Sequence, residues 1–177
     1  IATEGVGIAI RNMQQGKVRY LTAGKGQHDL SSDAVYALAT DNEGRMWIGT
    51  HKGGCNVISS SDGRFVTIAN DPFNGNSLIG NFVYSFAESK TDEDIFIGTD
   101  GNGLSIWNRR SNRFTNYVHH AGDASSISHN SVTNIFTDYT GKIWMTTLGG
   151  GVNQFSKATG KFKHYKLLNT ANGTENK

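Results

Sequence analysis

"MWIGTHKGG" (46–54) is a stretch that the chain contains three times in related form. It returns 49 residues later as "IFIGTDGNG" (95–103) and 48 residues after that as "IWMTTLGGG" (143–151). The opening residues "IATEGVGI" (1–8) align without gaps on "IGTDGNGL" (97–104). A repeat of about 48 residues therefore organises the sequence, which starts inside one copy of it.

Each copy contains the same four segments in the same order. A segment that starts with valine comes first, as in "VYALATD" (35–41), and a polar turn leads from it to the aromatic run around Trp47. A Gly-rich turn, a short apolar segment such as "GCNVI" (54–58) and an aromatic segment such as "RFVTI" (64–68) follow. Alternating apolar residues, β-branched and aromatic enrichment, and frequent turns are typical of strands joined by hairpins. Each repeat is therefore predicted to form four antiparallel strands.

Repeats of this length with four strands each predict a β-propeller, in which every blade buries its faces against its neighbours. The predicted fold class is all-β: a propeller fragment of four-stranded antiparallel blades, about three and a half of them in this chain. The predicted units are a partial blade of outer strands at 1–30 and blades at 31–79, 80–128 and 129–177, all parts of one propeller domain.

Three aromatic residues, Trp47, Phe96 and Trp144, occupy one position of the repeat. We predict that they fill the core between blades, since large aromatic side chains dominate core energetics. A platform for stacking a ligand is the alternative role for these rings. Two residues further on, Gly49 and Gly98 are predicted to allow a close approach of the backbone.

The repeat resembles the two-component regulator propeller repeat. The order V-x-x-[IL]-x-x-D-x-x-G-x-[IL]-W-I-G-T-x-x-G-G-[LV] is seen in "VYALATDNEGRMWIGTHKGGC" (35–55) and "VTNIFTDYTGKIWMTTLGGGV" (132–152). The middle copy, "VYSFAESKTDEDIFIGTDGNGL" (83–104), lacks the Asp and Gly of the turn and has one extra residue, so its turn is expected to be remodelled.

The resemblance implies a function. Repeats of this family form large periplasmic sensor propellers of hybrid histidine kinases, especially in gut Bacteroidetes, where they detect carbohydrate fragments and control polysaccharide-utilisation genes. By resemblance, the chain belongs to a periplasmic sensor that recognises an oligosaccharide and signals to a histidine kinase, anchored to the inner membrane by regions outside this sequence. The chain itself is not expected to be an enzyme, because the kinase would lie in a C-terminal region absent here.

Two other functions stay open: a propeller-fold carbohydrate-active enzyme or lyase, and a protein-interaction scaffold. No Ser-His-Asp or paired-carboxylate arrangement recurs where blades would converge, so catalysis has little support. No cofactor or metal is expected either. "GTDGNG" (98–103) leads into a strand, whereas phosphate-binding loops lead into a helix. The carboxylates at 92–94 lack the ligand spacing of a calcium loop, and the histidines at 119, 120 and 129 are read as surface residues.

Composition and charge limit the kinds of binding partner that the chain is expected to have. The 177 residues carry a net charge of +2, and the basic residues gather on the predicted fourth strands, where they discourage unwanted strand pairing. No nucleic-acid partner is expected, since the aromatics among them recur at core spacing. No apolar run is long enough for a membrane span, so this segment is not expected to contact the membrane. We expect the rest of the sensor, or a second copy, to complete the propeller, because closed propellers have about four to eight blades.

Strand direction predicts where a ligand binds. If the first strand is innermost, its start and the end of the second strand share one face, so the blade-joining loops and Gly-rich turns surround one mouth of the channel. Loops carry function because they vary without disturbing the scaffold. The alternative is that these are solvated loop residues with no ligand. Other residues on this face are Glu4, Asp33, Phe82 and Leu148. The predicted ligand-binding residues are His51, Lys52, Asn81, Asp100, Asn102, His129 and Asn130.

Overall fold

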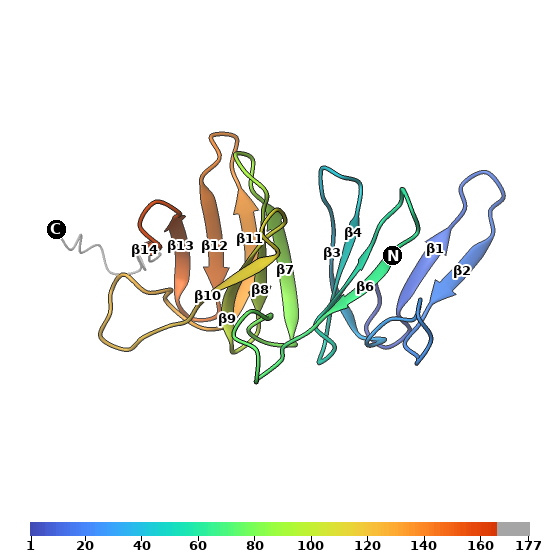
Figure 1. Ribbon diagram of the computed structural model, residues 1–177, viewed down its shortest axis with the longest axis horizontal. Helices are drawn as coiled ribbons and strands as arrows, with labels where there is room; N and C mark the ends of the chain where they lie inside the picture. Colours follow the sequence, from blue (N-terminus) through green and yellow to red (C-terminus); the bar gives the residue numbers. More distant parts are fainter. Residues whose placement is uncertain (166–177) are drawn as a thin grey trace, which may run out of the picture.

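The computed structural model describes residues 1–165, and every regular element in that range is a β-strand (Figure 1). The predicted unit at 129–177 extends beyond the described residues, and Lys166, one of the basic residues assigned to the predicted fourth strands, lies outside them. The strands are β1 (Ile8–Arg11), β2 (Val18–Leu21), β3 (Val35–Thr40), β4 (Met46–Thr50), β5 (Cys55–Ile58), β6 (Phe65–Ile68), β7 (Val83–Glu88), β8 (Asp94–Thr99), β9 (Gly103–Asn108), β10 (Arg113–Tyr117), β11 (Val132–Thr137), β12 (Ile143–Thr147), β13 (Gly151–Ser156) and β14 (Lys161–Tyr165).

The strands form one two-stranded and three four-stranded sheets. The sheets are β1-β2, β3-β4-β5-β6, β7-β8-β9-β10 and β11-β12-β13-β14, and every pairing between these strands is antiparallel. The sheets follow one another side by side, and the first strands β3, β7 and β11 contact each other in succession (Figure 1). This arrangement confirms the all-β prediction of about three and a half propeller blades. The exact unit boundaries stay a prediction.

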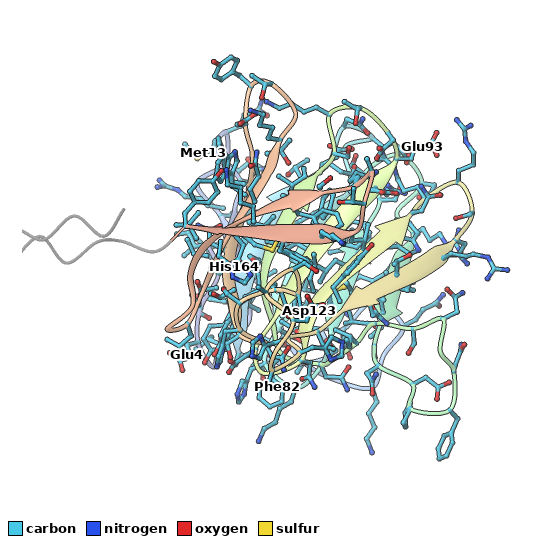
Figure 2. All side chains as sticks on the ribbon, turned by 90° about the vertical axis from the view of Figure 1, so that its left-hand side faces the viewer. Glu4, Met13, Phe82, Glu93, Asp123 and His164 are labelled. Atoms are coloured by element: carbon cyan, nitrogen blue, oxygen red, sulfur yellow. The ribbon has the colours of Figure 1, made fainter. Side chains whose placement is uncertain are left out.

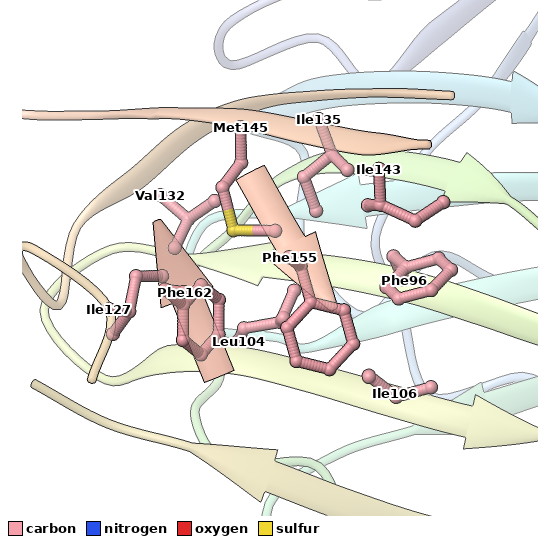
Figure 3. Close-up of a cluster of buried hydrophobic side chains, with 10 residues drawn as sticks. All are labelled: Phe96, Leu104, Ile106, Ile127, Val132, Ile135, Ile143, Met145, Phe155 and Phe162. Atoms are coloured by element: carbon pink, nitrogen blue, oxygen red, sulfur yellow. The ribbon is translucent and has the colours of Figure 1, made fainter. Parts of the chain in front are cut away.

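A hydrophobic cluster fills the space between each pair of neighbouring sheets. Between the last two sheets, Phe96 packs edge-on to Phe155 with ring centroids 6.1 Å apart (Figure 3). Between the middle two, the ring centroids of Trp47 and Trp107 lie 5.4 Å apart. Successive sheets are therefore held together mainly by burial of apolar and aromatic surface.

The aromatic repeat position is a core position in two of its three copies. Trp47 and Phe96 are 1% and 0% exposed, whereas Trp144 is half-buried. The ring of Trp144 packs beside Tyr165 on the face of β11–β14 that no described sheet covers. We call this surface the open face; it includes Phe136, Trp144 and Tyr165.

The two glycines that share one position of the repeat lie where neighbouring sheets touch. A Cβ atom on Gly49 would lie 2.8 Å from the Val83 carbonyl oxygen, and one on Gly98 would lie 2.9 Å from Val132 Cγ1. Both valines begin the first strand of the next sheet, so glycine is what allows that strand to approach. The third copy carries Thr146 at this position, on the open face.

Candidate functional site

The blade-joining loops and the Gly-rich turns lie on one face of the molecule, which we call the loop face. They are tied together by backbone hydrogen bonds: the Gly54 amide donates to the Asn81 carbonyl at 2.9 Å, and the Gly103 amide donates to the Asn130 carbonyl at 2.7 Å. In Figure 2 the loop face is the lower edge of the molecule, where Glu4 and Phe82 lie. Met13 and Glu93 lie at the upper edge, which we call the turn face. Each tie joins one sheet to the next, so the loop face is a continuous rigid rim.

Aromatic and carboxylate side chains gather on the loop face beside the innermost strands. The Tyr36 hydroxyl donates to Glu4 Oε1 at 2.9 Å, and the Tyr84 hydroxyl donates to Asp100 Oδ2 at 3.2 Å. The rings of Tyr36 and Tyr84 are 5.3 Å apart. We call this group, together with two further rings, the mouth cluster: Glu4, Tyr36, His51, Phe82, Tyr84 and Asp100.

The remaining rings complete a contiguous aromatic surface that links three sheets. His51 packs edge-on to Phe82 with ring centroids 4.5 Å apart, and its ring lies 5.7 Å from that of Tyr36. Glu4 lies in the segment before β1 of the first sheet. Tyr36 is in β3 and His51 directly follows β4 of the second sheet, and Phe82 directly precedes β7 of the third. The cluster therefore exists only because the sheets stack in this order.

The carboxylates also set the ionisation of the tyrosines. Hydrogen bonding to Glu4 raises the pKa of Tyr36, and burial followed by the charge of Asp100 raises the pKa of Tyr84. Both hydroxyls consequently stay protonated well above neutral pH and act as fixed donors to the carboxylates. The face offers planar rings, carboxylate oxygens and an imidazole within one surface.

Of the predicted ligand-binding residues, the structure brings His51 and Asp100 into the mouth cluster. Lys52 is exposed beside them with a left-handed backbone, at φ 69°. Asn102 is also exposed, and its side chain lies directly over Gly80. These two residues occupy the loop face next to the cluster without joining it.

The other three predicted residues use their side chains to hold loops. Asn81 Oδ1 accepts a hydrogen bond from the Asn70 amide at 2.7 Å, and Asn130 Oδ1 accepts one from the His119 amide at 2.6 Å. His129 Nδ1 accepts one from the Ser131 amide at 3.0 Å. Their side-chain acceptors are therefore already engaged within the protein.

Sequence reasoning missed Tyr36 and Tyr84. Both follow the valine that opens the first strand, in "VY" at 35–36 and again at 83–84, and the third copy has Thr133 there. A tyrosine repeated at the entry of the innermost strand was the available signal. It was overlooked because alternation alone does not show which side of an inner strand faces a channel.

Other chemistry is limited in the described range. Within residues 1–165, no three His, Cys, Asp or Glu side chains are grouped so that they could hold a metal ion. Burial raises the pKa of the Cys55 thiol to about 12, which makes it unreactive at neutral pH. The same range has no helix long and apolar enough to cross a membrane.

Comparison with known proteins agrees with this fold. Residues 29–52 match the family model described as "Two component regulator propeller". The extracellular domain of a protein described as a hybrid two component system of B. thetaiotaomicron is 27% identical, with a TM-score of 0.66, over 74% of this chain and 18% of that one. No curated protein sequence matches the chain.

Two more distant structures share the fold. The extracellular domain of a protein described as a one component system of B. thetaiotaomicron is 18% identical, with a TM-score of 0.67, over 85% of this chain and 20% of that one. PorZ, a bacterial surface component of the type-IX secretion system of Porphyromonas gingivalis, is 14% identical, with a TM-score of 0.65, over 94% and 25%. The chain thus spans about a fifth of the length of the first two solved structures.

The fold defines a segment of an all-β propeller with about three and a half blades. Residues 29–52 match the two component regulator propeller repeat, and the chain is similar to the extracellular domain of a hybrid two component system, which confirms the resemblance that the sequence suggested. Two of the matched structures are extracellular domains of proteins described as two component or one component systems, which is consistent with a location outside the cytoplasm.

Proposed function

We propose that this chain is part of a periplasmic sensor that recognises an oligosaccharide at the mouth cluster and signals to a histidine kinase anchored in the inner membrane. The observation that carries the proposal is the pairing of tyrosine with carboxylate on the loop face, Tyr36 with Glu4 and Tyr84 with Asp100. The similarity to an extracellular domain of a hybrid two component system supports the signalling part.

The chemistry of the mouth cluster suits sugars. Aromatic rings pack against the C–H faces of pyranose rings, and carboxylate oxygens accept hydrogen bonds from neighbouring hydroxyls. Each carboxylate binds its tyrosine through one oxygen, so the second oxygen is the natural acceptor for a ligand. The tyrosines hold the carboxylates in place, which reduces the entropy lost on binding.

The cluster favours binding over catalysis. A glycosidase needs two carboxyl groups placed across one bond, one of which has a raised pKa. Glu4 and Asp100 instead belong to separate tyrosine pairs on different sheets. A protein-interaction scaffold is the remaining alternative. Leu148 favours it, because this exposed apolar residue occupies the repeat position that Glu4 and Asp100 hold in other copies.

The test is a binding titration by calorimetry on the full natural protein with a panel of neutral plant and host oligosaccharides. Asp100→Asn and Tyr84→Ala should each weaken binding of the recognised glycan about tenfold or more, while Tyr84→Phe should have a smaller effect because it keeps the ring. Phosphorylation of the kinase in response to the same glycan should fall in parallel.

Tyr139→Ala is the matched control, since Tyr139 is 92% exposed in a turn on the opposite face. It should bind as the wild type does. Unchanged glycan affinity in both Asp100→Asn and Tyr84→Ala would remove the mouth cluster as the recognition site. No binding of any glycan by the wild type would count against a carbohydrate sensor.

A further inference from the structure

A cavity lies between the sheets β3–β6 and β7–β10, away from the mouth cluster. It has a volume of about 550 Å³, within the range of roughly 300–1,000 Å³ typical of small-molecule pockets. We call it the outer cleft, because the third and fourth strands of the two sheets and their turns on the turn face line it. Its principal lining residues are Arg45, Ser59, Arg64, Trp107, Arg109 and Asn112.

One wall of the outer cleft is aromatic and rigidly held. The guanidinium of Arg45 lies 5.7 Å from the ring centroid of Trp107 and 6.0 Å from that of Trp47. Trp107 Nε1 donates to Asn112 Oδ1 at 3.0 Å. The Trp107 ring is therefore fixed from both sides, while part of its surface stays exposed.

Asn112 holds the Trp107 ring at the expense of backbone strain. Its φ of 53° is left-handed, and Gly63 and Gly160 occupy the same place in the corresponding turns, with φ of 68° and 66°. A non-glycine residue in this conformation is disfavoured, although asparagine tolerates it best. The strained position thus carries a side chain that orients the aromatic wall.

The floor of the cleft is polar, and its charges are nearly balanced. Arg45 Nε binds Asp41 at 2.7 Å and Arg45 Nη1 lies 3.1 Å from Glu43. Arg109, whose side chain is 6% exposed, lies 3.0 Å from Glu88. With Arg64 and Asp62, which also line the cleft, three guanidinium groups stand beside four carboxylates, which disfavours an anionic ligand.

Two hydrogen-bond donors on the floor of the outer cleft have no partner within the described residues. Among residues 1–165, Arg45 Nη2 and Arg109 Nε are buried nitrogens without a hydrogen-bond partner. Such groups are rare in native structures and call for an explanation. Donors of this kind, alongside carboxylates and hydroxyls, match a ligand that both donates and accepts hydrogen bonds without carrying charge.

The equivalent groove between β7–β10 and β11–β14 is different. Asp94 takes the place of Arg45, and Lys157 takes the place that Arg109 has in the outer cleft and forms ion pairs with Asp92 and Asp94. The groove has a volume of about 210 Å³, with Tyr117 and Phe155 in its lining. The same scaffold thus holds an open polar cleft at one junction and a smaller ion-paired groove at the next.

We propose that the outer cleft is a second ligand site, which binds a neutral saccharide ring stacked on Trp107. The ring would take hydrogen bonds from the guanidinium groups of Arg45 and Arg109 and from Ser59, and give them to the carboxylates of the floor. The proposal is independent of the mouth cluster, which lies on the opposite face.

The experiment is calorimetric titration of the full natural protein with glucose, galactose, mannose, xylose, arabinose and their neutral disaccharides. Every titration uses protein that also carries Asp100→Asn and Tyr84→Ala, so that the mouth cluster does not contribute. Saturable binding of at least one of these sugars is expected. Trp107→Ala should weaken it at least tenfold, and Trp107→Phe should stay within about threefold, since Phe155 fills this place in the next sheet.

Two further variants keep the test decisive if Trp107→Ala does not fold. Asn112→Gly suits the left-handed backbone and frees the indole, so affinity should fall several-fold while the melting temperature stays close to the parent value. Ser61→Trp should obstruct the cleft, and Arg110→Trp, at the corresponding turn position of the next sheet, should leave affinity unchanged. The proposal is overturned if no neutral sugar binds, if glucuronate binds better than every neutral sugar, or if Ser61→Trp and Asn112→Gly bind like the parent protein.

Discussion

The pairing of an aspartate with a tryptophan explains much of the repeat at the level of single residues. Asp41 Oδ2 accepts from Trp47 Nε1 at 2.8 Å, and Asp138 Oδ2 accepts from Trp144 Nε1 at 2.8 Å. In the middle copy Phe96 stands where the tryptophans are, and Ser89 stands where the aspartates are. Donor and acceptor are lost together, as a buried hydrogen bond requires. The expected remodelling of this turn is visible as the ion pairs of Asp92 and Asp94 with Lys157.

Asp41→Ala should destabilise the protein by about 3 kcal/mol, because it leaves the buried Trp47 indole nitrogen without an acceptor and the Arg45 guanidinium with only the exposed Glu43 as a partner. Asp41 also accepts hydrogen bonds from the Glu43 and Arg45 amides at 3.0 Å each, so the variant loses the contacts that hold this turn. Thermal or denaturant unfolding measures the loss. The double variant Asp41→Ser with Trp47→Phe copies the middle repeat, and should be at least about 1 kcal/mol more stable than the two single changes predict by addition.

The effect of Asp41→Ala should depend on pH. Burial raises the Asp41 pKa, but hydrogen bonds from Trp47 and Arg45 outweigh it and leave the carboxyl pKa below its usual value. A carboxyl group with a lowered folded-state pKa stabilises the protein above its unfolded pKa of about 3.9, and this stabilisation disappears as pH falls through the folded value. Wild type and Asp41→Ala should therefore converge in stability at acid pH. A constant difference down to pH 2 would contradict the assignment.

At the level of strands and sheets, the spacing between blades depends on one glycine. The first strand of each following sheet, which begins at Val83 or Val132, approaches the backbone at Gly49 or Gly98. The close approach lets β3, β7 and β11 contact one another around the inner side of the array. A side chain at this position would separate the inner strands and disturb the rim on which the mouth cluster depends.

Gly49→Ala should cost about 1–3 kcal/mol, as overpacking of a close-packed interior does. The added methyl group would lie 2.8 Å from the carbonyl oxygen of Val83, which cannot move without shifting β7. Chemical denaturation gives the measurement. Thr146→Ala is the matched control at the same repeat position, and as an exposed change it should stay within about 0.5 kcal/mol. Equal effects of the two changes would show that packing between blades is not the cause.

The strands were predictable because their evidence is local and repeated. The alternation in "VYALATD" (35–41) and the aromatic run at 46–50 occur three times, so chance patterns are excluded. The candidate functional faces were harder to predict from the sequence, because they depend on contacts between sheets. Asn81 was predicted to bind ligand, yet its side-chain oxygen accepts from the Asn70 amide. The role of Arg45 was not predicted, because only folding places its guanidinium against Trp107.

At the level of the whole molecule, the loop face and the turn face are held together by different kinds of interaction. Backbone hydrogen bonds between sheets stiffen the loop face, where the mouth cluster joins residues of three sheets. The turn face is held by ion pairs between turns, such as Arg109 with Glu88. A propeller segment of this kind can thus present separate surfaces at opposite ends of the same inter-blade junction.

The open face leads to the last prediction, that the 177-residue chain alone associates through it. Phe136 is 63% exposed and Tyr165 is 37% exposed, beside the half-buried Trp144, whereas the corresponding Ala39 and Trp47 of the earlier sheet are covered by the next sheet. Contiguous apolar surface of this kind drives association in water. Light scattering should show a mass that rises with concentration, and Phe136→Lys should reduce it without changing the circular dichroism spectrum. Tyr139→Lys, which changes an even more exposed aromatic residue outside this face, should not reduce it. A concentration-independent monomer would show that the open face needs no partner, either from the rest of a longer chain or from a second copy.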